Sequence, residues 1–209
     1  MSEIEEYILQ HIDAEPVQLA ELYRTANIRL LNPRMLAGHL QGRILKMLVR
    51  MFRPARILEI GTFTGYAALC MAEGLAEGGQ IDTIESDDEM EDFIREQFAR
   101  SPFGGKIRLH IGDAVKVIPA LEGKFDMVYI DGDKREYCAY YEAVFERVRR
   151  GGVILADNTL WGGKVMEKPH SGDRHTQEIV RFNEMLAKDR RIEKVILPLR
   201  DGLTVIYKL

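Results

Sequence analysis

FDMVYIDGDK, residues 125–134, and GGVILADNTLW, residues 151–161, indicate both the fold class and the predicted site of this sequence. Each stretch is an apolar run that ends in acidic and polar side chains, as a buried strand of a parallel sheet does before its loop. Ligands of α/β proteins bind at the carboxyl ends of such strands. We therefore expect the side chains that follow the two runs to meet at one edge of a sheet.

The polar side chains after the two runs suit a hard metal ion and a proton transfer. Asp131, Asp157 and the Asn158 amide are oxygen ligands of the kind that Mg²⁺, Ca²⁺ or Mn²⁺ binds. Lys134 is a candidate acceptor for the proton of a hydroxyl that such a metal acidifies. Alone, Asp157-Asn158 also fits a helix cap and Lys134 a surface ion pair, so the prediction depends on the four residues together.

From Ala55 onward the chain alternates between strand-like and helix-like segments. Five apolar runs, each followed by a helical pattern, predict a doubly wound, Rossmann-like, mainly parallel sheet. Asp201-Gly202 between two apolar runs predicts a closing antiparallel hairpin. The expected strands are 56–60, 80–85, 107–111, 125–130, 153–156, 194–199 and 203–209, and the expected helices are 66–77, 87–100, 114–121, 135–149 and 175–188.

The first 52 residues form a helical segment in front of this core. Pro16 begins a second helix, and Asn32-Pro33 separates it from a third helix at 35–52. No linker or internal repeat interrupts the chain. We expect a single domain over residues 1–209, with the helical segment at 1–52 and the α/β core at 55–209. The apolar surface of the helical segment suggests a homodimer.

Composition disfavours several classes of protein. The 209 residues carry a net charge of −4 and are 46% hydrophobic, and they contain no basic stripe that would bind nucleic acid or an anionic membrane. No apolar run of about 18 residues and no charged-then-apolar leader occurs. Both cysteines lie in apolar helical patterns, which suits a reducing compartment. We therefore expect a cytoplasmic protein that binds neither nucleic acid nor membrane.

The turn after the first strand predicts a cofactor site. In LEIGTFTGY (58–66), Gly61 and Gly65 let a ligand approach the backbone closely. Their G-x-x-x-G spacing is not the dinucleotide fingerprint, and a purely structural turn is the alternative.

Acidic residues surround this predicted site. Glu85 ends the second strand, where an acidic residue typically binds ribose hydroxyls. Asp113, after the third strand, could accept a hydrogen bond from an adenine amino group or simply cap a helix. With Glu59 and Asp131, these carboxylates suit a cationic sulfonium better than a pyrophosphate.

With these motifs the chain resembles the cation-dependent class I S-adenosylmethionine O-methyltransferases, the family of caffeoyl-CoA and catechol O-methyltransferases. The resemblance extends from about Asn32 to Leu209. It depends on four motifs in order, LEIGTFTGY, VYIDGDKREYCAYY, GGVILADNTLWGGKV and LPLRDGLTV. It implies a class I methyltransferase that transfers a methyl group from S-adenosylmethionine to a hydroxyl of a small aromatic, catechol-like acceptor.

The resemblance also implies residue roles. Asp131, Asp157 and Asn158 match the protein ligands of a divalent cation, Mg²⁺ or alternatively Ca²⁺ or Mn²⁺. Lys134 matches the general base, and Trp161 matches an aromatic residue that contacts the acceptor ring. The predicted cofactor contacts are Glu59, Gly61, Thr62, Phe63, Tyr66, Glu85, Asp113, Ala114, Asp131 and Tyr140.

Two departures from the family limit this transfer. Ala67 replaces a serine that usually binds the cofactor carboxylate, and Gly162 replaces an asparagine that plant enzymes carry near the substrate. The polar stretch 164–174 is expected to be a surface loop that could cover the substrate. The identity of the acceptor therefore does not follow from the sequence.

Three other functions fit parts of the sequence. The glycine spacing and the closing hairpin disfavour an NAD(P)-dependent reductase on a Rossmann-like fold. The net charge and the lack of an N-P-P-aromatic or D-P-P-aromatic motif disfavour a nucleic-acid methyltransferase. The intact set of two aspartates, asparagine and lysine disfavours an S-adenosylmethionine-binding protein without catalysis.

Overall fold

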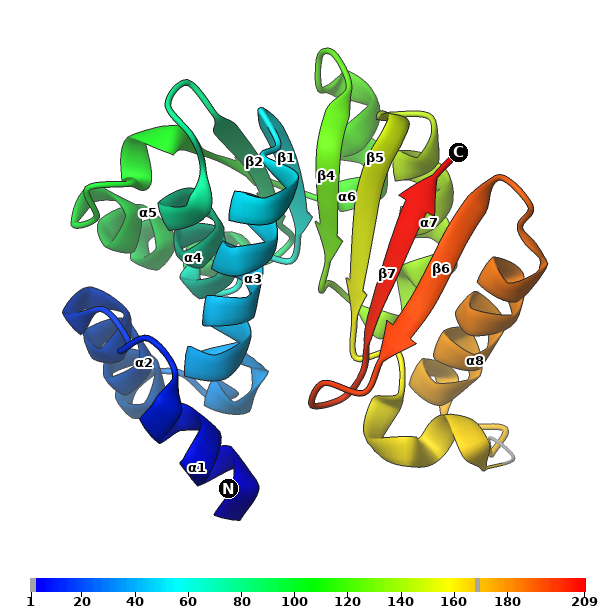
Figure 1. The fold of residues 1–209 in the computed structure, drawn as a ribbon, viewed down its shortest axis with the longest axis horizontal. Coiled ribbons are helices and arrows are strands. Elements are labelled where there is room, and N and C mark those ends of the chain that lie inside the picture. The colour runs from blue at the N-terminus through cyan, green and yellow to red at the C-terminus, as the bar shows by residue number, and fades with distance from the viewer. Residues whose placement is uncertain (1–2, 168–169) are drawn as a thin grey trace.

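The computed structural model describes residues 3–167 and 170–209. Seven strands form one sheet in the order β3-β2-β1-β4-β5-β7-β6 (Figure 1). Strands β1 to β5 pair in parallel, whereas β7 runs antiparallel to both β5 and β6. The predicted fold class is thereby confirmed. The strands are β1 (Arg56–Ile60), β2 (Gln80–Glu85), β3 (Ile107–Ile111), β4 (Phe125–Ile130), β5 (Val148–Asp157), β6 (Ile192–Leu197) and β7 (Leu203–Lys208).

Helices cover both faces of the sheet (Figure 1). Side chains of β4 alternate between the two apolar layers, with Tyr129 packed toward α3, α4 and α5 and its neighbours Val128 and Ile130 toward α6, α7 and α8. This two-sided burial explains why the strands are continuous apolar runs. The helices are α1 (Glu3–His11), α2 (Val17–Arg29), α3 (Gly38–Phe52), α4 (Tyr66–Gly74), α5 (Glu91–Ala99), α6 (Ala114–Val117), α7 (Tyr137–Phe145) and α8 (Arg174–Lys188).

The predicted helix at 135–149 is wrong at its end. Helix α7 ends at Phe145, and β5 already begins at Val148, which pairs with Phe125 of β4. The residues after Phe145 gave no signal of a strand, because the buried Val148 is followed by exposed Arg149 and Arg150 and by Gly151 at a φ of 71°.

Other helices differ from their predicted limits for local reasons. The third helix begins at Gly38 rather than at 35, because Pro33–Met35 forms a separate 3₁₀ turn. The helix predicted at 114–121 becomes α6 and a 3₁₀ turn, Ile118–Ala120, that contains a proline without an N–H donor. Part of the loop predicted at 164–174 is helical, since η6 spans Trp161–Met166, and residues 168–169 of that loop lie outside the described residues.

The N-terminal helices pack against α3 and α4, on the outer side of these helices (Figure 1). Leu19, Leu22 and Ala26 of α2 are buried there, while α1 buries no residue. Among the described helices, none has both the length and the apolarity needed to cross a bilayer. The single-domain organisation expected for 1–209 stays a prediction.

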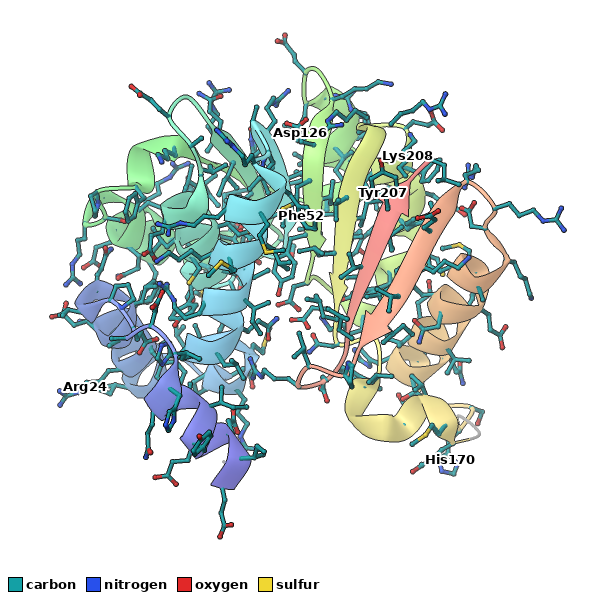
Figure 2. The ribbon with its side chains drawn as sticks, viewed as in Figure 1. Arg24, Phe52, Asp126, His170, Tyr207 and Lys208 are labelled. Carbon is teal, nitrogen blue, oxygen red and sulfur yellow. The ribbon has the colours of Figure 1, made fainter. Side chains whose placement is uncertain are left out.

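Polar contacts at the amino-terminal edge of the parallel strands brace the sheet far from the predicted site. Asp126, near the upper edge in Figure 2, accepts hydrogen bonds of 2.8 Å from the amides of Ala55 and Arg56. Lys208, at the same edge, donates to the carbonyls of Phe145 and Val148 over 2.6 and 3.0 Å. Asp126 and Lys208 are thus hydrogen-bonded to the backbone of the fold itself. The predicted ligand site lies at the opposite edge, at the carboxyl ends of the parallel strands.

Candidate functional site

A cavity of about 630 Å³ opens at the carboxyl ends of the parallel strands. The turn after β1, the end of β2 and the loops after β4 and β5 form its wall, together with the segment before α3 and the turn between β6 and β7. The predicted site residues in this wall are Gly61, Thr62, Phe63, Tyr66, Glu85, Asp131, Lys134, Asp157, Asn158 and Trp161.

Four predicted cofactor contacts do not line the cavity: Glu59, Asp113, Ala114 and Tyr140. Glu59 is fully buried and accepts a 2.5 Å hydrogen bond from Thr83. Burial raises the pKa of its carboxyl to about 8. Asp113 caps α6 by accepting from the Val115 amide over 3.0 Å, the structural alternative that the sequence also allowed. Tyr140 packs against Gly132 from behind the wall.

The glycine turn after β1 is hydrogen-bonded to Glu85 at the end of β2. Gly61 has a φ of 95°, and a side chain there would collide with the backbone of Asp131. Glu85 accepts hydrogen bonds from the amides of Phe63 (2.6 Å) and Asp87 (2.9 Å), so its carboxylate is held at the rim of β2. This rigid acidic edge beside an open turn is suited to a ligand with a pair of hydroxyl groups.

Backbone strain concentrates at this cavity. Five described residues other than glycine have a positive φ, and four of them line the cavity: Phe63, Asn158, Trp161 and Arg200. Such conformations are costly for L-residues and persist where the surrounding structure enforces them. Their clustering marks the cavity, rather than another surface, as the functional candidate.

Tyr129 joins the two predicted metal carboxylates. Its hydroxyl lies 2.9 Å from Oδ2 of Asp157 and 3.4 Å from Oδ2 of Asp131. Oδ1 of Asp157 accepts from the backbone amide of Asn158 over 2.8 Å. Asp157 is 4% exposed, so both its position and its orientation are set by these partners.

The donor set fits a divalent cation. Burial raises the pKa of Asp131, and the charge of Asp157 adds to that shift, while Lys134 opposes it. A bound cation would relieve the repulsion between the two carboxylates, and two carboxylates with an amide are oxygen ligands for a hard ion. Within residues 3–167 and 170–209, no cluster of three or more His, Cys, Asp or Glu side chains forms a metal site, so Asn158 and non-protein ligands would have to complete this one.

Lys134 lines the cavity beside the proposed metal ligands. Its Nζ atom donates to Oδ1 of Asp131 over 2.8 Å and to the hydroxyl of Tyr137 over 2.7 Å. Tyr137 in turn donates to the backbone carbonyl of Asp157 over 2.9 Å. With 11% of the Lys134 side chain exposed, this is a fixed contact and not a solvated surface pair.

Several residues of the wall were missed by the sequence analysis. His175 stacks on Trp161, with ring centroids 6.1 Å apart and planes at 20°. Gln41 from α3 and Arg200 from the last turn reach the predicted metal end. Their only signal in the sequence was position, because each follows or precedes an element whose end faces the cavity.

Comparison with known proteins settles the class of the protein. A model of an O-methyltransferase family matches residues 10–209. The chain belongs to this O-methyltransferase family. The membership confirms the resemblance to class I S-adenosylmethionine O-methyltransferases and the predicted enzyme class, and it leaves the reductase alternative without support.

Individual relatives agree with the family over most of the chain. The O-methyltransferase ankF of Aspergillus thermomutatus is 32% identical and covers 98% of this chain and 92% of its own length. Caffeoyl-CoA O-methyltransferase of Stellaria longipes is 31% identical over 79% of this chain and 73% of its own. The crystal structure of the O-methyltransferase from Bacillus cereus in complex with SAH matches with a TM-score of 0.92, at 28% identity, over 99% of this chain and 98% of that one.

Proposed function

We propose that this O-methyltransferase transfers the methyl group of S-adenosylmethionine to one hydroxyl of a small aromatic acceptor with two adjacent hydroxyls, in a reaction that depends on a divalent cation. One observation carries the proposal: two carboxylates, an amide and a lysine line the same cavity as the glycine turn and Glu85. The Bacillus cereus neighbour is described with SAH, the demethylated form of the cofactor, which supports this choice of cofactor.

The cofactor end of the cavity is assigned to the glycine turn and Glu85. The Glu85 carboxylate would accept hydrogen bonds from the ribose hydroxyls, since its oxygens already face the cavity rim while two backbone amides hold it. Gly61 would let the cofactor lie against the backbone. The acidic surroundings favour a sulfonium cation over an anionic nucleotide.

The acceptor end is assigned to the metal ligands and Trp161. Asp131, Asp157 and Asn158 would hold the cation, which supplies Lewis acidity toward the acceptor hydroxyls when bound. Trp161, braced by His175, would pack against the acceptor ring. Together these residues fix the reacting oxygen in front of the methyl group, and positioning of this kind supplies much of the acceleration in group transfer.

Lys134 is assigned as the proton acceptor. Its Nζ atom would take up the proton that the acceptor hydroxyl loses as the oxygen accepts the methyl group. In the structure Lys134 donates to Asp131 over 2.8 Å. A cation on Asp131 would compete with the lysine for that carboxylate and so leave the amine free to contact the acceptor hydroxyl.

A homodimer is part of the proposal. The side chains that support it are large, apolar and exposed in the N-terminal segment: Ile4, Tyr7, Val17, Ile28, Leu31 and Met35. Patches of this kind mark interaction surfaces in soluble proteins. Light scattering coupled to size-exclusion chromatography tests it, with a mass near 48 kDa, about twice the 23.9 kDa of the chain, expected.

Two measurements test the reaction itself. Titration calorimetry with SAH and with NAD compares the cofactors, and heat with SAH but none with NAD is expected. Turnover on a panel of catechols and matched monophenols tests the acceptor. Methylation of monophenols at the rate of catechols would contradict the assignment of an adjacent diol.

A further inference from the structure

Gln41 is a buried amide whose hydrogen bonds all go to the predicted metal end or to one arginine. It lies on α3 and is 6% exposed. Its Nε2 atom donates to the hydroxyl of Tyr129 over 2.9 Å and to Oδ2 of Asp157. Its Oε1 atom accepts a 3.0 Å hydrogen bond from Nη1 of Arg200. The amide therefore links Arg200 to a proposed metal ligand.

Arg200 determines which way this amide points. A guanidinium can only donate, so the carbonyl end of Gln41 must face Arg200 and the NH₂ end must face Asp157. Without the arginine, the amide could turn its oxygen toward the carboxylate, where two acceptors would repel each other. The arginine thus keeps two N–H donors aimed at Tyr129 and Asp157.

The turn that carries Arg200 is itself held on both sides. Arg200 has a φ of 47° and also donates to the carbonyl of Ala37, just before α3. On the other side, the Asp201 carbonyl accepts from the Leu160 amide over 2.8 Å, and Oδ1 of Asp201 accepts from Gly162 over 3.0 Å. In Figure 1 the turn between β6 and β7 lies between α3 and the yellow segment that follows β5. Through Arg200 and Asp201, this turn links α3 to the segment that follows Asn158.

We propose that Arg200 is a positioning residue which, through Gln41, holds the Asp157 carboxylate in the orientation that binds the divalent cation. The inference rests on the proposed function, because it takes Asp157 as a metal ligand. The side-chain hydrogen bonds of Arg200 in the described part of the chain go to Ala37 and Gln41 and not to the proposed metal ligands. Residues that orient metal ligands from outside typically change metal affinity by 10–100-fold when they are replaced.

Mn²⁺ affinity of the whole protein separates two effects of removing Arg200. Loss of its charge and loss of its positioning role should change this affinity in opposite directions. A positive side chain repels a cation, so its removal alone should tighten Mn²⁺ binding. Arg200→Gln should instead weaken Mn²⁺ binding by about 10–100-fold, as followed by electron paramagnetic resonance. Arg200→Lys, which keeps the charge and one donor direction, should recover part of the loss. SAH affinity and the melting temperature should stay near those of the wild type.

Arg34→Gln is the matched control. Arg34 also lines the cavity, but it has no hydrogen bond or ion pair within the described part of the chain. Its removal should leave Mn²⁺ affinity unchanged or tighten it. Equal weakening in both arginine variants would show a general effect on the cavity and would overturn the positioning role.

Hydrogen exchange of the Gln41 side-chain amide reports its orientation without any added metal. In ¹⁵N-labelled protein, the side-chain NH₂ of Gln41, identified by its loss in Gln41→Met, should exchange slowly with solvent in the wild type and quickly in Arg200→Gln. Wild-type Mn²⁺ affinity in Arg200→Gln, or an equally protected amide, would overturn this inference alone. A wild-type protein that binds no Mn²⁺ would overturn both the proposed metal and the inference.

Discussion

Nζ of Lys134 lies 2.8 Å from Oδ1 of Asp131, so the proposed general base and a proposed metal ligand form one ion pair. This contact is the point at which metal binding and proton transfer meet. Replacing either residue should affect the reaction in a different way.

Lys134→Ala should lower kcat by about 10²–10⁴-fold, the usual effect of losing a general base. SAH affinity should change little, because the lysine contacts Asp131 and Tyr137 and not Glu85 or the glycine turn. A pH–rate profile at saturating metal and cofactor gives the measurement. The control is Arg95→Ala, which removes an exposed ion pair with Glu91 on α5. A Lys134 variant with wild-type kcat from pH 6 to 9 would assign the lysine a structural role.

Glu85→Gln should weaken cofactor binding by about 1–3 kcal/mol, the cost of a lost charged hydrogen bond. The substitution keeps the size of the side chain but replaces one carboxylate oxygen with an NH₂ donor. Glu85 accepts hydrogen bonds from two backbone amides, and the new donor would face one of them. Calorimetry with SAH measures the change. Unchanged affinity would remove Glu85 from the cofactor site.

Glu59 should make stability depend on pH. Its pKa in the folded protein is about 8, because burial favours the neutral acid, whereas the unfolded chain has the ordinary lower value. The folded state then binds more protons than the unfolded state between these values. Its stabilising contribution is full below the unfolded pKa and is lost as the pH rises through about 8.

Urea unfolding of the wild type and of Glu59→Gln from pH 5 to 9 measures this effect. The glutamine variant should lose less stability than the wild type as the pH rises, while Glu96→Gln, an exposed change on α5, should follow the wild type. Parallel curves for the wild type and Glu59→Gln would show that Glu59 does not titrate in this range.

The sequence predicted the fold and one end of the site because both depend on local patterns. Each parallel strand was a short apolar run, and Asp201-Gly202 marked the hairpin. Asp131 directly follows β4 and Asp157 ends β5, and the two strands are neighbours in the sheet, so the meeting of these aspartates followed from topology alone. The start of β5 was missed because Val148 is separated from the apolar run by two exposed arginines and Gly151.

The rest of the site depends on contacts between distant parts of the chain. Gln41 and Arg200 are 159 positions apart and meet only after the hairpin has closed beside α3. His175 reaches the cavity because α8 begins next to Trp161. No periodicity or motif carries such information. Glu59 and Asp113 failed to reach the cavity wall for a related reason, since one is buried under the turn and the other caps a helix.

Asp157→Ala tests whether Asp131, Asp157 and Asn158 hold a cation that methyl transfer needs. Chelator-treated wild-type protein should lose transfer from S-adenosylmethionine to a catechol and regain it when Mg²⁺, Mn²⁺ or Ca²⁺ is added, to differing degrees. Asp157→Ala, with SAH affinity retained, should show no recovery, since one carboxylate and an amide rarely suffice to hold a hard cation. Full wild-type activity in excess chelator would contradict the claim for all three residues.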